Sequence, residues 1–164
     1  SSAYIALLQR NQAFKALEAS QQALAAELAE AADYVRSLLP APLDQPEIRT
    51  AWAFLPCSSL GGDAFGYFAI DDDHFAVFLL DVCNHGVGSA LLSVSAMNAL
   101  MGRTLVGVDF REPARVMAAL NNVFLMEKHN NLYFTIFFFS RCGTANGRKA
   151  PAACAIPAAA IRRR

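Results

Sequence analysis

The chain has 164 residues, of which 55% are apolar and 17% charged, and its 14 basic and 14 acidic side chains cancel. This composition excludes a wholly disordered chain, and the length suffices for one domain with a substantial core. The zero net charge argues against general nucleic-acid affinity, and no apolar run approaches the ~20 residues of a membrane span. The chain has no signal-peptide pattern, and its four cysteines form no CxxC pair. We therefore expect a cytoplasmic protein with reduced thiols.

Residues 1–39 lack glycine and proline and carry apolar side chains at alternating steps of four and three. This spacing predicts a coiled-coil helix that forms a parallel homodimer. A single amphipathic helix lying on its own domain is the alternative. The predicted dimer seam contains Leu7, Phe14, Leu17, Leu24, Leu28, Val35 and Leu38. Three prolines within residues 40–46 predict the end of the helix and a linker.

Residues 47–140 are predicted to form the folded domain, with an α+β architecture in which helices cover an antiparallel sheet. Alternating side chains predict a first strand over residues 47–56. Two further strands, 65–70 and 74–82, are expected to form a hairpin around the exposed acidic turn 71–73.

The second part of the domain is predicted to contain two helices and a strand. Small and apolar residues at helical spacing predict a buried helix over residues 87–105. A second helix is expected over residues 110–129, with Pro113 in its first turn, and a strongly apolar strand over 132–140. Residues 141–164 have no periodicity. This lack of a pattern indicates either an aberrant tail on a truncated or frame-shifted domain or a flexible natural tail.

Two aspartates, Asp63 and Asp81, occupy positions that structure alone does not explain. Asp63 completes a Gly-Gly-Asp sequence and Asp81 ends an apolar strand, so pairing of the two strands can bring both to one end of the sheet. Neighbouring carboxylates repel each other unless a metal lies between them, and all-oxygen ligation suits Mg²⁺ or Mn²⁺. A two-metal site can activate a bridging water toward a phosphate. Tight turns without a metal are the alternative.

The segments "LGGDAFGYF", "FLLDVCNHGVGSALL" and "LNNVFLMEKHNNLYFTIFF" follow one another in an order that resembles the SpoIIE/RsbU-type serine phosphatases of bacteria, in the metal-dependent PPM superfamily. The resemblance covers roughly residues 34–138. It implies an α-β-β-α sandwich, here incomplete at its C-terminus, with a two-metal Mn²⁺ or Mg²⁺ centre. It also implies hydrolysis of phosphoserine on a STAS-type anti-sigma-factor antagonist, regulated through the coiled coil from a receiver or sensor domain.

The resemblance also assigns roles to individual residues. It gives Asp63 and Asp81 catalytic and metal-binding roles, and it makes the backbone carbonyl of Val82 a further ligand. His85 is expected to organise a turn, with acid catalysis as the alternative. The turn residues near the site are Gly61, Gly62, Asn84, His85 and Gly86.

Several positions depart from the family pattern. Leu80 and Asn84 replace glycines, and Phe65–Gly66 replaces an aromatic–aspartate pair, although asparagine tolerates a left-handed backbone. Two further family aspartates have no counterpart, because no acid follows Glu127. Three readings therefore stay open: an active phosphatase domain, a truncated inactive one, and a non-catalytic dimerising or partner-binding module. Asp109, between the two helices, is expected to act as a cap.

Overall fold

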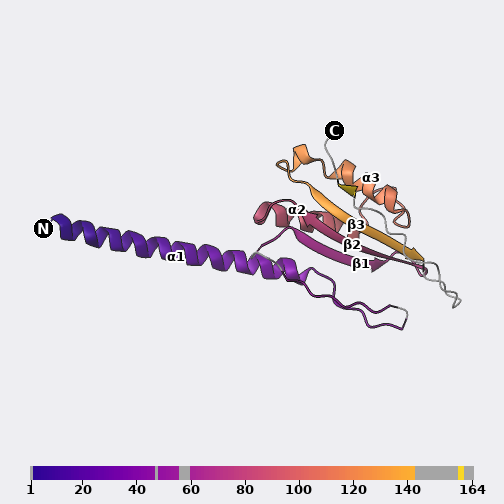
Figure 1. Ribbon diagram of the computed structural model, residues 1–164, viewed down its shortest axis with the longest axis horizontal. Helices are drawn as coiled ribbons and strands as arrows, with labels where there is room; N and C mark the ends of the chain where they lie inside the picture. The colour runs from indigo at the N-terminus through magenta and orange to yellow at the C-terminus, as the bar shows by residue number, and fades with distance from the viewer. Residues whose placement is uncertain (1, 47, 56–59, 143–158, 161–164) are drawn as a thin grey trace.

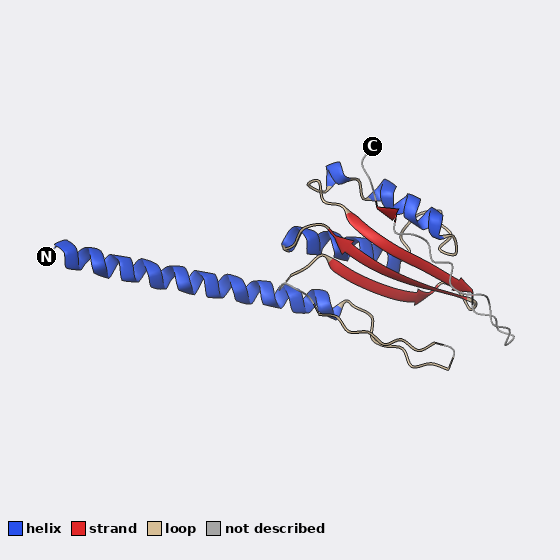
Figure 2. Cartoon of the chain, in the orientation of Figure 1, coloured by secondary structure: helices blue, strands red, loops and turns tan. Residues whose placement is uncertain are grey.

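The computed structural model describes residues 2–46, 48–55, 60–142 and 159–160. The elements in chain order are α1 (Ser2–Ser37), β1 (Asp63–Ala69), β2 (His74–Val82), α2 (Val87–Met101), α3 (Pro113–Val123), the 3-10 helix η1 (Met126–Lys128), β3 (Phe134–Cys142) and β4 (Ala159–Ala160). Helix α1 projects from the rest of the molecule as a single rod (Figure 1). The remaining helices lie beside one sheet (Figure 2).

The strands form one antiparallel sheet in the order β1-β2-β3-β4. The predicted hairpin is confirmed, because β1 pairs with β2 around the turn 71–73 with Ala69 opposite Phe75. The mixed α+β class is likewise confirmed. The described residues contain this one sheet, so the second sheet of an α-β-β-α sandwich stays a prediction.

Helices α2 and α3 cover one face of the sheet. Helix α2 contacts β1 and β2, and α3 contacts β3. On β2, alternate residues from Ala76 to Val82 are buried, as period-two packing requires. The largest fully buried side chains include Phe78, Phe134, Met97, Leu100 and Leu120.

Gly66 lies on this covered face, at a position where the family pattern has an aspartate. A Cβ atom added there would lie 2.5 Å from the ring of Phe78 and 3.0 Å from the sulfur of Met101. The Phe78 ring occupies the space over the glycine, so a side chain at this position would require that ring to move.

The prediction of a strand over residues 47–56 is wrong for residues 48–55, which the structure describes. Residues 48–55 contain no strand, and the nearest pairing is an isolated bridge between Asp44 and Arg49. Prolines at both ends of the segment lack the N–H groups that a sheet ladder needs. Its aromatic residues instead pack on the sheet, with the rings of Trp52 and Phe65 4.9 Å apart and edge-to-face.

The end of α1 is attached to the domain through the predicted linker. Leu39 is buried in the core, and the hydroxyl of Tyr67 in β1 donates a hydrogen bond of 2.6 Å to the carbonyl of Ala41. The hydroxyl of Thr50 donates to the Tyr67 oxygen at 3.0 Å and accepts from the backbone N–H of Leu43 at 2.7 Å. The position of α1 is therefore coupled to β1.

Helix α1 confirms the predicted long helix, and its 36 residues span about 54 Å. The seam residues Leu7, Phe14, Leu17 and Leu24 are exposed, whereas Leu28, Val35 and Leu38 are half-buried. The homodimer stays a prediction. None of the helices that the structure describes has both the length and the apolarity that a bilayer crossing requires.

The other predicted elements form with shifted ends. The helix predicted over 87–105 ends at Met101, before Arg103 adopts a left-handed conformation with φ 52°. The single helix predicted over 110–129 is divided, because the backbone leaves the helical conformation at Phe124, whose ring packs 5.7 Å from that of Phe134. Most of the predicted tail lies outside the described residues.

Candidate metal centre

Asp63 and Asp81 lie directly opposite each other on β1 and β2. Both side chains are exposed, and they lie on the face of the sheet that α2 and α3 leave open. The Cβ atoms of such cross-strand partners are about 5 Å apart, so both carboxylates can reach one small cation. The structure thus brings together the two acids that the sequence singled out, and their roles stay a prediction.

The electrostatics of this pair are unfavourable without a cation. Partial burial raises the pKa of Asp63 above its usual value, and Asp81 raises it further through charge repulsion and a shared hydrogen bond. A divalent cation between the two carboxylates would replace this repulsion by attraction. The two carboxylates are therefore better suited to binding a cation than to stabilising the metal-free protein.

Gly62 lets the two strands approach each other beside the acids. A Cβ atom at this position would lie 2.7 Å from the Cβ of Val82 and 2.9 Å from its carbonyl oxygen. The N–H of Val82 donates a hydrogen bond of 3.3 Å to the carbonyl of Gly62. Gly62, the second glycine of the Gly-Gly-Asp sequence, therefore allows the backbone to pass close to the side chain and carbonyl of Val82.

The turn after β2 uses two left-handed residues to connect the strand to α2. Asn84 has φ 65° and Gly86 has φ 95°, so Asn84 adopts the left-handed backbone that asparagine tolerates better than most residues. The hydroxyl of Ser89 in α2 donates a 2.9 Å hydrogen bond to the carbonyl of Cys83 and holds the turn against the helix. His85 is exposed and forms no hydrogen bond through its ring to any described residue, so its role stays a prediction.

Strand β3 adds Thr135, to which the sequence analysis assigned no role. Thr135 pairs with Asp81, so Asp63, Asp81 and Thr135 form one row across three strands. Thr135 is half-buried, and its hydroxyl forms no hydrogen bond within the described part of the chain. Leu79 and Phe137 form the next row and are 52% and 42% exposed, so the open face beside the acids is apolar.

The donor atoms fit a hard divalent cation. The predicted ligands are two carboxylates and the Val82 carbonyl, all oxygen, and Mg²⁺ commonly binds through one or two carboxylates while keeping several waters. The described residues hold no group of three or more His, Cys, Asp or Glu side chains that could bind a metal. Water would therefore supply much of the coordination at this pair.

The last turn of α1 lies close to Asp63. Val35 and Arg36 line a crevice of about 20 Å³ together with Gly61 and Asp63. Arg36 is also paired with Asp33 on the same helix, at 3.3 Å. A displacement of α1 would therefore alter the surroundings of Asp63.

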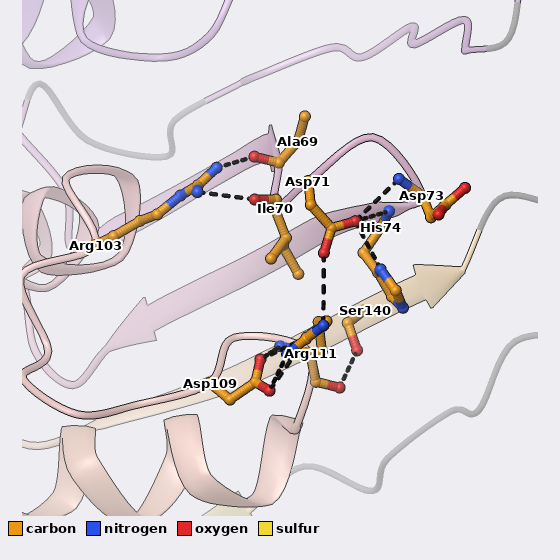
Figure 3. Close-up of polar contacts among 9 residues, drawn as sticks. All are labelled: Ala69, Ile70, Asp71, Asp73, His74, Arg103, Asp109, Arg111 and Ser140. Carbon is orange, nitrogen blue, oxygen red and sulfur yellow. Dashed lines mark hydrogen bonds and ion pairs between the residues drawn. The ribbon is translucent and has the colours of Figure 1, made fainter.

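The acidic turn at the other end of the hairpin has a structural role (Figure 3). One carboxylate oxygen of Asp71 accepts hydrogen bonds from the backbone N–H groups of Asp73 and His74, at 2.9 and 2.8 Å. It also lies 2.7 Å from the imidazole Nδ1 of His74, and this hydrogen bond lowers the pKa of Asp71. The predicted exposed turn over residues 71–73 is confirmed.

The expectation that Asp109 caps a helix is wrong. The N-cap of α3 is Glu112, and Asp109 instead accepts hydrogen bonds from the backbone N–H and the guanidinium of Arg111. These bonds lower the pKa of Asp109 to about 2. Arg111 also lies 4.0 Å from Asp71 and so links the α3 side to the hairpin turn, as Figure 3 shows.

Comparison with known proteins identifies relatives for most of the domain. Residues 71–164 match the family model described as "Stage II sporulation protein E (SpoIIE)". "Phosphoserine phosphatase RsbP" of Bacillus subtilis is 28% identical over 95 residues, which are 58% of this chain and 23% of that protein. "Protein IcfG" of Synechocystis sp. is 33% identical over 73 residues, which are 40% of this chain and 11% of that protein. The chain thus spans less than a quarter of either relative.

One solved structure extends the comparison to the fold. The "SiaA-PP2C domain of Pseudomonas aeruginosa" superposes with a TM-score of 0.55 and 20% sequence identity, covering 74% of this chain and 49% of that one. At this identity the likeness concerns the fold alone. The mixed arrangement of helices and antiparallel sheet described above is consistent with it.

Proposed function

Because this chain belongs to the SpoIIE family, we propose that its domain is a metal-dependent protein-serine phosphatase. The observation that carries the proposal is the direct pairing of Asp63 with Asp81 at one end of β1 and β2. Two facing carboxylates on an open sheet face are a costly arrangement for a fold and a suitable one for Mn²⁺ or Mg²⁺.

Each residue of the site has a defined task in this proposal. Asp63 and Asp81 hold the cation from adjacent strands, and the Val82 carbonyl is a further oxygen donor beside them. Bound Mn²⁺ or Mg²⁺ supplies charge for the phosphoryl oxygens and lowers the pKa of a bound water. Gly62 and Asn84 shape the backbone so that the acids and the carbonyl share one end of the sheet.

The family relationship supports a proposal for the substrate. We assign a phosphoserine protein of STAS type, an anti-sigma-factor antagonist, as the substrate, and a phosphoserine phosphatase among the relatives supports the phosphoserine part of this choice. The open face beside the acids carries Leu79 and Phe137. These exposed apolar side chains support the second sheet of an α-β-β-α sandwich as their covering layer.

Helix α1 is the proposed route of regulation, as a coiled-coil linker in a homodimer. Leu39 is buried in the core and the Tyr67–Ala41 hydrogen bond joins the linker to β1. Since Val35 and Arg36 line the same crevice as Asp63, a rearrangement of the coiled coil would act directly on a proposed metal ligand.

A non-catalytic partner-binding module is the second candidate. The observation in its favour is the number of acids, since the described residues bring two carboxylates together and the sequence has no acid after Glu127. In that case the fold and the coiled coil would bind a partner without releasing phosphate.

The two candidates are separated by phosphate release from a phosphorylated STAS-domain protein in the presence of Mn²⁺. Under the phosphatase proposal, Asp81→Asn reduces the rate at least about 100-fold, because one of two carboxylate ligands is lost. Asp72→Asn removes an exposed carboxylate at the other end of the hairpin and leaves the rate unchanged. If the wild type and Asp81→Asn are equally inactive while partner binding persists, the binding module is the correct reading.

A further inference from the structure

Thr135 completes a row with the two acids. It is the register partner of Asp81 on β3, as Asp63 is on β1, so the three side chains lie on the same open face. Thr135 is half-buried, and its hydroxyl has no hydrogen-bond partner among the described residues. By contrast, the hydroxyls of Thr50, Ser89 and Ser140 all form hydrogen bonds.

We propose that Thr135 is a positioning residue of this site, whose hydroxyl hydrogen-bonds a water of the divalent cation held by Asp63 and Asp81. The inference rests on the proposed metal centre and adds a residue to it. An Mg²⁺ or Mn²⁺ ion bound by two carboxylates keeps several waters. Among the described residues, the Thr135 hydroxyl lies in the same row as Asp81 and is available to such a water.

The strand spacing favours contact through water over direct ligation. Adjacent strands lie about 4.8 Å apart, so a cation between β1 and β2 lies roughly 7 Å to the side of β3. The short threonine side chain cannot span that distance to ligate the ion at about 2.1 Å. An intervening water, with a hydrogen bond of about 2.8 Å, closes the gap.

Threonine also has a structural explanation, because β-branched residues are favoured in strands. Thr135→Val keeps the branched shape and removes only the hydroxyl, whereas Thr135→Ser keeps the hydroxyl and removes the methyl group. Ser140→Ala is the matched control, because it removes a hydroxyl from the same strand where that group donates to the carbonyl of Arg111.

The test measures Mn²⁺ affinity of the whole chain by calorimetry, with the free ion followed by electron paramagnetic resonance. We expect Thr135→Val to weaken binding about tenfold, and Thr135→Ser and Ser140→Ala to bind like the wild type. Circular dichroism establishes that each variant is folded. Equal affinity of Thr135→Val and the wild type would overturn the inference, as would a Thr135→Ser variant as weak as Thr135→Val.

The outcomes also separate this inference from the proposed function. If the wild type binds Mn²⁺ and Thr135→Val binds it tenfold more weakly, the inference stands even where no phosphate is released. If the wild type hydrolyses phosphoserine but Thr135→Val binds Mn²⁺ as tightly, the phosphatase stands and the inference fails. A wild type that binds no Mn²⁺ overturns both the metal centre and the role of Thr135.

Discussion

Asp63 of β1 faces Asp81 of β2 as its direct cross-strand partner. Like charges in this position destabilise a sheet by a few tenths to about 1 kcal/mol. The protein therefore places a small electrostatic cost at the end of its hairpin, and the size of that cost can be measured separately from any activity.

Asp63→Asn is expected to stabilise the metal-free protein at pH 7 by about 0.5 kcal/mol, because it removes the repulsion from Asp81. The raised pKa of Asp63 means that the folded state holds this proton more tightly than the unfolded state does. The stability that protonated Asp63 contributes is complete below its unfolded pKa of 3.8. It is lost as the pH rises through the pKa of Asp63 in the folded protein. Urea unfolding at pH 7 and pH 3, in the presence of a chelator, measures the difference.

The gain should therefore disappear at pH 3, where the raised pKa of Asp63 keeps its carboxyl group protonated. Asp72→Asn, at the exposed turn, serves as the control and should leave the stability almost unchanged at either pH. A wild type that is more stable than Asp63→Asn at pH 7 without metal would contradict the repulsion.

Gly62→Ala is expected to destabilise the fold by about 1–3 kcal/mol, because the new methyl group overlaps the side chain and carbonyl of Val82. Gly88→Ala is the matched control in α2, since its Cβ would lie 3.5 Å from Leu132, an ordinary contact. That change should leave the stability equal or raise it by up to about 1 kcal/mol. Thermal unfolding followed by circular dichroism distinguishes the two, and equal melting temperatures would contradict the close approach of the strands.

The hairpin and the meeting of its two acids could be predicted from the sequence, because the pairing is local and a short acidic turn connects the strands. The place of Thr135 could not, since β3 pairs with a strand from which α2, α3 and η1 separate it in the chain. The predicted strand over 47–56 failed for a related reason. Its alternating pattern is real, but its aromatic side chains cover Phe65 while its backbone forms only an isolated bridge, between Arg49 and Asp44.

Asp109→Asn is expected to destabilise the protein at pH 7, because Asp109 binds the guanidinium of Arg111 as a carboxylate. The pKa of Asp109 is lowered to about 2 from 3.8, so its contribution is present above the unfolded value and is lost as the pH falls through about 2. Urea midpoints of both proteins between pH 7 and pH 2 should therefore converge at the acidic end. A difference in urea midpoint that stays constant from pH 7 to pH 2 would show that the charge of Asp109 does not contribute to the difference in stability.

Phe14→Glu is expected to convert the predicted dimer into a monomer, because it places a charge in the predicted apolar seam of α1, where Phe14 is 60% exposed in the single chain. Gln22→Glu introduces the same charge on α1 outside the seam and should leave the dimer intact. Light scattering measures the mass directly. A wild type with the mass of one chain would exclude the coiled-coil dimer at that concentration.

The turn at residues 71–73 has a consequence for the far end of its hairpin. Because side chains alternate between faces, a slip of one residue between β1 and β2 would move Asp63 and Asp81 to opposite sides of the sheet. The seven residues of β1 extend about 23 Å from that turn, and the hydrogen bonds accepted by Asp71 fix its length. Inserting one residue there would leave both acids in the sequence and yet separate them in space.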